Sequence, residues 1–90
     1  MSAGNRYLIA PHVLAQEVGD EVVLLELNSN TYFGLNAVGS RMWLLVKEGK
    51  SLAEICDMLF DEFEVSREEL ERDTALLAEE LMTRGLISRQ

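Results

Sequence analysis

The residue types that most often carry chemistry are scarce in this 90-residue chain. Cys56 is its single cysteine and His12 its single histidine, so the chain can form neither an internal disulfide nor a zinc site with the usual cysteine and histidine ligands. A Cys-His pair could act as a nucleophile, but Cys56 shares the apolar face of an expected helix with Ile55 and Leu59. That position favours a buried, inert thiol. We therefore expect no catalytic residues, no metal and no cofactor.

Carboxylates are plentiful, and they give the chain a formal net charge of −8. A pair of carboxylates can hydrolyse a substrate when burial raises the pKa of one of them, but no acid here lies in a sequence context that indicates burial. From Glu54 to Glu80 eleven acidic residues stand against only Arg67 and Arg72. Such a surface repels duplex DNA, because DNA affinity comes mainly from basic side chains on phosphates. It is either a solvated face that keeps the domain soluble or a surface that attracts a basic peptide.

Three short segments rich in β-branched and apolar residues predict strands at 13–18, 21–28 and 31–35. Gly19-Asp20 and the cluster Asn28-Ser29-Asn30 separate them. Glycine and asparagine tolerate the positive φ of tight turns between twisted strands, so both separators indicate hairpins.

The middle strand has two faces, because successive side chains point to opposite sides of a sheet. Its alternate residues form one set of Val23, Leu25 and Leu27 and a second set of Val22, Leu24 and Glu26. We expect the first set to point at the core.

Beyond Leu35 the apolar period changes from two to about 3.6, which predicts helices. Asn36 is an N-cap candidate for a first helix that ends at Gly49. Capping-box patterns, Ser51 with Glu54 and Ser66 with Glu69, precede a second and a third helix. The apolar stripes of the three helices are Val38, Met42, Leu45 and Val46; Leu52, Ile55, Cys56, Leu59, Phe60 and Phe63; and Leu70, Thr74, Leu77 and Leu81. Gly85 ends the last helix and leaves residues 86–88 as a short extended tail.

The element order predicts an α+β fold of the winged helix-turn-helix type, in which an N-terminal three-stranded antiparallel sheet is followed by three α-helices. We expect a single domain over residues 1–90, with residues 1–6 as a flexible tail. The longest apolar runs, such as 22–25, are far shorter than the roughly 20 residues of a membrane span, and the N-terminus lacks the apolar stretch of a secretory signal. A cytoplasmic protein without a membrane span is expected. The fold alone does not decide the function, since winged helices bind DNA, protein or neither.

Several residues together resemble a known family. The run Thr31-Tyr32-Phe33-Gly34-Leu35-Asn36 is followed by Gly39 and Trp43, and later by Leu77, Leu81 and Gly85-Leu86-Ile87. This pattern is similar to the PqqD-like family, the recognition elements of ribosomally synthesised and post-translationally modified peptides (RiPPs), and it covers about residues 7–88. The asparagine-rich turn before Thr31 resembles the free-standing members of lasso-peptide pathways more than the coenzyme-PQQ members, which usually carry a proline-glutamate element there.

The resemblance implies a domain without chemistry of its own. In this family the leader segment of a precursor peptide pairs with the third strand and lies against the third helix, for delivery to a separate leader peptidase or another maturation enzyme. The segment 31–35 agrees, because it contains no proline and no charge, two common devices that blunt a sheet edge. Gly34 either leaves room for a second backbone or eases the chain into the first helix.

The candidate peptide-binding residues are Thr31, Tyr32, Phe33, Gly34, Leu35, Asp73, Leu76, Leu77 and Glu80. Leu76 is an apolar residue among acids; it is either ordinary surface or the wall of a groove for an apolar leader side chain, with Asp73 and Glu80 meeting basic leader residues. The opposite shoulder of the helix offers an alternative wall, made of Ala75, Ala78 and Met82. Tyr32 and Phe33 project from opposite faces of the strand, so one of them packs inward. Trp43 is at a position more typical of core than of an interface.

A DNA-binding winged helix is the alternative function. Its recognition helix would span residues 66–84, which carry Arg67, Arg72 and Arg84 but also six acids: Glu68, Glu69, Glu71, Asp73, Glu79 and Glu80. This composition disfavours direct readout of bases. We therefore expect a peptide partner and no nucleic acid.

Overall fold

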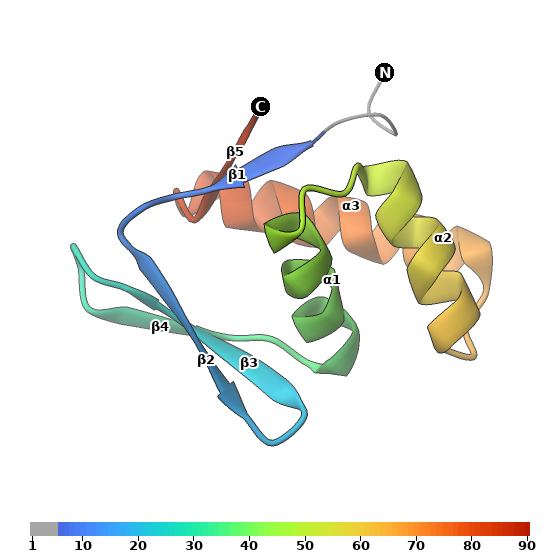
Figure 1. The fold of residues 1–90 in the computed structure, drawn as a ribbon, viewed down its shortest axis with the longest axis horizontal. Coiled ribbons are helices and arrows are strands. Elements are labelled where there is room, and N and C mark those ends of the chain that lie inside the picture. The colour runs from blue at the N-terminus through green and yellow to red at the C-terminus, as the bar shows by residue number, and fades with distance from the viewer. Residues whose placement is uncertain (1–5) are drawn as a thin grey trace.

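The computed structural model describes residues 6–90. Figure 1 shows a β-sheet on one side of three helices, with a short second sheet at the chain ends. The strands are β1 (Tyr7–Ile9), β2 (Val13–Val18), β3 (Glu21–Glu26), β4 (Thr31–Gly34) and β5 (Ile87–Arg89), and the helices are α1 (Ala37–Lys47), α2 (Leu52–Glu62) and α3 (Arg67–Thr83). The antiparallel order β2-β3-β4 and the three helices after it confirm the predicted α+β fold.

The two ends of the described chain form the small sheet that the sequence did not predict. β1 pairs antiparallel with β5, so the extended tail after Gly85 has a strand partner. Each strand has three residues, too few for a period of two to be recognised. Of the expected flexible tail, residues 1–5 lie outside the described residues. Arg6 donates from Nε to the carbonyl oxygen of Gly49 at 3.1 Å, and its own carbonyl accepts from the N–H of Gln90 at 2.9 Å.

The prediction for the core face of β3 is wrong. Val22 and Leu24 are buried at 2% and 0% exposure, whereas Val23 and Leu25 are half-buried and Leu27 is exposed. Glu26, which shares the inner face, lies at the end of β3, and its carboxylate accepts the backbone N–H groups of Asn28 and Ser29. A charge is tolerated on that face because it closes the turn at the periphery of the sheet.

The predicted helix starts are confirmed. The side chain of Asn36 accepts the N–H of Gly39 at 2.8 Å, and the Oγ of Ser66 accepts the N–H of Glu69 at 3.1 Å. At α2 the capping box is complete, because Ser51 Oγ accepts from the Glu54 N–H and the Ser51 N–H donates to the Glu54 carboxylate. These hydrogen bonds with Ser51 lower the pKa of the Glu54 carboxyl below its usual value.

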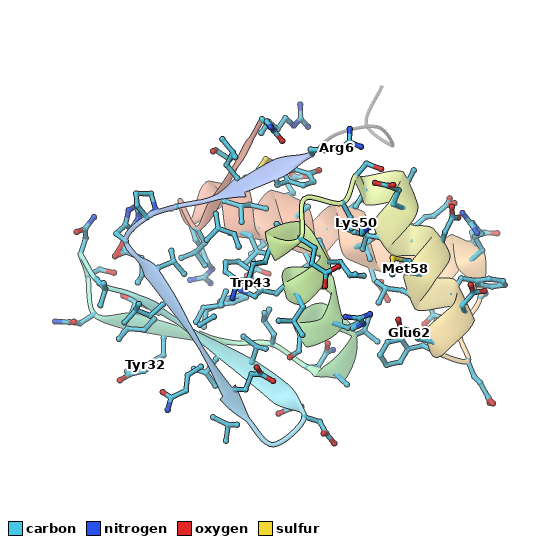
Figure 2. The ribbon with its side chains drawn as sticks, viewed as in Figure 1. Arg6, Tyr32, Trp43, Lys50, Met58 and Glu62 are labelled. Carbon is cyan, nitrogen blue, oxygen red and sulfur yellow. The ribbon has the colours of Figure 1, made fainter. Side chains whose placement is uncertain are left out.

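The core lies between the helices and the inner face of β3. Trp43 is 2% exposed, as expected for a core residue (Figure 2). Cys56 is also buried, with its Sγ 3.3 Å from the Oγ1 of Thr74 in the α2–α3 contact. His12 lies elsewhere, with its Nε2 3.8 Å from a carboxylate oxygen of Glu26. The thiol is therefore a core side chain, as predicted.

Four residues of the predicted helix stripes are not fully buried: Val38, Phe60, Phe63 and Leu77. Phe60 is 44% exposed, and the guanidinium of Arg67 lies 5.7 Å from its ring centroid. Phe60 lies at the border of the α2 stripe, where the cation covers one face of the ring in place of core side chains. Leu77 is half-buried, because it borders the cleft described below.

Candidate functional site

A cleft of about 380 Å³ lies where β4, the start of α1 and the middle of α3 meet. Its floor is apolar, with Val38 and Met42 from α1, Val65 before α3, and Leu70 and Leu77 from α3. Two carboxylates, Asp73 and Glu80, line it as well, and the side chains of both are at least half exposed. The arrangement suits a ligand with an apolar side chain and a neighbouring positive charge.

Gly39 sets how closely α1 and α3 approach each other at the base of the cleft. A Cβ added to Gly39 would lie 3.1 Å from the Cδ2 of Leu77 and 3.3 Å from the Oδ1 of Asn36. Any larger residue would press on both the N-cap and the cleft wall. The glycine therefore positions Leu77 beside the strand end and keeps the helix cap intact.

The strand β4 has a free edge. It is an outer strand of the β2-β3-β4 sheet. The Leu35 N–H donates to the Val22 carbonyl at 2.9 Å. Because alternate residues of an antiparallel strand bond to the same neighbour, the backbone groups of Phe33 also face β3. Those of Tyr32 and Gly34 face away from it, toward open space.

The backbone conformation at position 34 does not require a glycine. Its φ is not in the left-handed region, and a Cβ placed on it would meet nothing within 4 Å. A bend into α1 therefore does not require glycine here. The open space beside Gly34 allows another backbone to approach, which is the other interpretation of this residue.

The charges at the rim of the cleft change from acidic along α3 to basic at the C-terminal end of this helix. Leu76, 60% exposed, lies on the turn of α3 between Asp73 and Glu80. At the C-cap of α3, Arg84 pairs with Glu80 at 3.4 Å, and its guanidinium lies 4.9 Å from the ring centroid of Phe33. The rim is thus acidic along α3 and ends at one cation stacked on β4.

The structure brings together seven of the nine predicted site residues: Phe33, Gly34, Leu35, Asp73, Leu76, Leu77 and Glu80 all line the cleft. Thr31 lies instead at a smaller hollow of about 160 Å³, together with Ser29 and Arg84. Tyr32 is 68% exposed, and Figure 2 shows its side chain on the side of the sheet away from the helices. Tyr32 and Phe33 were expected to project from opposite faces of the strand, and Phe33 packs inward while Tyr32 points outward.

Sequence reasoning missed the floor of the cleft. Val38, Met42, Leu70 and Thr74 were assigned to core stripes, yet they also line the cleft. Val65, which lies between the second and third helices and was not singled out, lines it too. A residue on the apolar stripe of a helix follows the same period whether protein or a ligand covers it. Periodicity therefore could not distinguish core residues from residues of the cleft floor. None of the residues of the alternative wall lines the cleft. Ala75 is exposed, Ala78 is 2% exposed, and Met82 packs against the core.

Within residues 6–90, no three His, Cys, Asp or Glu side chains gather in a way that could hold a metal ion. The helices described for this chain are all too short or too polar to cross a membrane.

Comparison with known proteins relates this geometry to a family. The sequence matches the model of coenzyme PQQ synthesis protein D (PqqD) over residues 21–87, whereas no curated protein matches it. A solved structure of "TbiB1 in Complex with the TbiA(beta) Leader Peptide" is 44% identical, covers 89% of this chain and 93% of that chain, and has a TM-score of 0.83. A second, "Lasso peptide synthetase B1 complexed with the leader peptide", is 28% identical, covers 92% of this chain and 98% of that chain, and has a TM-score of 0.84. Since the PqqD model spans well over half of the sequence, and a relative 44% identical matches nearly all of it, this chain belongs to the PqqD family.

Proposed function

We propose that this protein captures the leader segment of a ribosomally synthesised precursor peptide and presents it to a separate maturation enzyme, a leader peptidase, in a lasso-peptide pathway. The leader adds to the sheet as a strand on β4 and lies in the groove between β4 and α3. The observation that carries the proposal is the coincidence of two features: the free edge of β4 and the apolar cleft against α3 share Gly34. The two similar solved structures are complexes with leader peptides.

The edge of β4 and the cleft against α3 recognise different parts of the leader. The backbone groups of Tyr32 and Gly34 bond to the leader backbone, which gives affinity that does not depend on sequence. Alternate leader side chains then point into the cleft, where Val38, Met42 and Leu77 surround an apolar side chain. Main-chain bonds and one apolar anchor support a dissociation constant in the micromolar range or better, about −8 kcal/mol or stronger.

No step of this function requires the protein to make or break a bond. Asp73 and Glu80 are exposed to water, so they act as charges toward basic leader residues and not as buried general acids. We place the capture in the cytoplasm, where ribosomally made precursors arise and where a single buried thiol such as Cys56 stays reduced.

Leu76→Ala should weaken leader binding about five- to tenfold, because it removes a contact at the mouth of the cleft. Asp73→Asn and Glu80→Gln should each weaken it less than about fivefold, since exposed ion pairs are individually weak. The two charge variants should instead flatten the dependence of affinity on salt. Fluorescence anisotropy with labelled leaders of candidate precursor peptides measures the affinities and their salt dependence.

Leu8→Ala is the matched control for Leu76→Ala. Leu8 is a similarly exposed leucine, at 51%, but it lies in β1 away from the cleft. Circular dichroism should show both variants folded, because neither side chain is buried. If the parent binds no candidate leader while it binds a DNA duplex at physiological salt, the proposed function is wrong. If it binds the leader and Leu76→Ala binds equally well, the α3 side of the groove is wrongly assigned.

A further inference from the structure

A second, smaller hollow lies at the start of β4, next to the cleft. We call it the end hollow; it has a volume of about 160 Å³ and is lined by Glu26, Ser29, Thr31, Phe33, Arg84 and Leu86. Phe33 lines the cleft as well, so the two spaces are neighbours at this side chain. Thr31 and Phe33 lie two residues apart and share the inner face of β4. A leader strand on β4 that sends one side chain into the cleft therefore sends its next inward side chain toward the end hollow.

Main-chain hydrogen bonds alone do not fix the register of an added strand. β4 has four residues, and only the backbone groups of Tyr32 and Gly34 face its open side. A leader shifted by two residues, about 7 Å, offers these groups the same donors and acceptors and keeps the same side chains on the inner face. The choice between such registers must therefore come from what the cleft and the end hollow accept.

The end hollow differs from the cleft in both size and chemistry. It has less than half the volume of the cleft and is lined mainly by polar side chains. The Glu26 carboxylate is already bonded to the N–H groups of Asn28 and Ser29. The hydroxyls of Ser29 and Thr31 bond to each other at 2.8 Å. The polar group that remains to meet a ligand is the guanidinium of Arg84.

Arg84 is positioned to bind a carboxylate. Its guanidinium lies on the ring of Phe33, 4.9 Å from the centroid, and pairs with Glu80 through one nitrogen at 3.4 Å. A guanidinium carries five N–H donors in a planar fork that matches a carboxylate, so one long contact leaves donors for a ligand. Among the described residues that line the cleft and the end hollow, Arg84 is the one cation. Elsewhere in the groove Asp73 and Glu80 repel an acidic side chain.

We propose that the end hollow is a subsite for an acidic leader side chain, two residues from the apolar anchor in the cleft, and that Arg84 binds its carboxylate and so determines the register of the leader. This inference rests on the proposed function. A shift by two residues in one direction places the leader acid against Asp73 and Glu80. A shift in the other direction places the apolar anchor over the polar end hollow. Both shifted registers are disfavoured, although the main-chain bonds are the same.

A charge exchange between Arg84 and the leader tests the proposal. A labelled leader that the parent binds is chosen from candidate precursor peptides, and each of its acidic residues is replaced by lysine in turn. In fluorescence anisotropy Arg84→Glu should bind the unchanged leader about tenfold or more weakly. One lysine leader, and no other, should bind Arg84→Glu within about threefold of the parent affinity, because the exchanged charges attract again. If Arg84→Glu does not fold, Arg84→Gln serves with glutamine in place of each leader acid, and the loss of affinity should vanish for the matching leader alone.

Arg67→Glu is the matched control. Arg67 is also on α3, pairs with the acid four residues on and lies over a ring, that of Phe60, but it is at the opposite end of the helix. The control changes the net charge equally and should bind the leader within about threefold of the parent.

Failure of the parent to bind any candidate leader would overturn the proposed function and this inference together. Three results would overturn this inference alone while leader binding by the parent stands. The first is a folded Arg84→Glu that binds no more weakly than Arg67→Glu. The second is a loss of affinity that no lysine leader restores, since Arg84 would then act only by supporting Phe33. The third is parent-strength binding of a leader without any acidic residue.

Discussion

Gly34→Pro is expected to remove most leader binding and to leave the free protein folded. The N–H of Gly34 faces the open side of β4, so the free protein loses no sheet hydrogen bond when proline replaces it. The leader loses the donor for one of its carbonyls and meets the proline ring at the edge. A bond to a backbone donor is worth about 1 kcal/mol and an unsatisfied partner costs more, so affinity should fall tenfold or more.

Gly34→Ala is the matched control, because it keeps the N–H. A Cβ at this position meets nothing within 4 Å in the free protein, so the alanine variant should fold like the parent. It should lose less affinity than Gly34→Pro, because it takes up part of the open space but keeps the donor for the leader. Anisotropy measures affinity, and circular dichroism confirms that both variants fold. A folded Gly34→Pro variant with the affinity of the parent would show that the leader does not pair with β4.

Leu24→Ala should lower the free energy of unfolding by about 2 to 5 kcal/mol, because it leaves a cavity in the core. Leu24 is 0% exposed on the inner face of β3. A domain of this size has roughly 5 to 10 kcal/mol of stability in total, so the variant should unfold at much lower urea concentration. No other single truncation in the sheet is expected to cost more.

Leu25→Ala, one residue along, should lower the free energy of unfolding by about 1 kcal/mol or less, since Leu25 is only half-buried on the face of the sheet away from the helices. Urea denaturation of both variants gives the two values. Equal costs, or a larger cost for Leu25→Ala, would mean that β3 presents the face with Leu25, and not the face with Leu24, to the helices.

Local signals were sufficient for the helical half of the fold. Asn36, Ser51 and Ser66 cap the helices as predicted, since a capping bond depends only on residues three apart. The hairpins were also predicted, because glycine and asparagine mark their turns. At Gly19 and Asn30, φ is +64° and +55°, the left-handed conformation that these residue types accept.

The choice between the two faces of β3 could not be made locally. Both faces carry branched apolar residues, and Glu26 on the inner face favoured the wrong choice. The contacts that position the strand are tertiary. One of them is the hydrogen bond from the N–H of Val22 to the buried Oγ of Ser40 at 2.7 Å, which ties that end of β3 to α1. No pattern within β3 contains that contact. A strand register shifted by one residue reverses every side chain, so the face is fixed by how β3 as a whole packs against the helices, with Val22 and Leu24 in the core.

The residues that β4 and α3 each contribute to the candidate site could be predicted from the sequence, but the way the elements pack together around the site could not. The edge residues and the acidic shoulder of α3 follow from strand and helix periodicity, together with the resemblance to the PqqD-like family. The floor made by Val38 and Met42 depends on how closely α1 approaches α3 at Gly39, a distance that no single element contains. The outward position of Tyr32 depends on the register of β4 with β3.

The central claim is that the leader becomes a strand on β4, and residue-resolved amide exchange by NMR tests it most directly. In the free protein Leu35, whose N–H is bonded to Val22, should exchange slowly, and Tyr32 and Gly34 should exchange fast. With saturating leader, exchange at Tyr32 and Gly34 should slow by about tenfold or more, while Leu35 changes little. Leader binding with unchanged exchange at Tyr32 and Gly34, and new protection confined to α3, would contradict the claim.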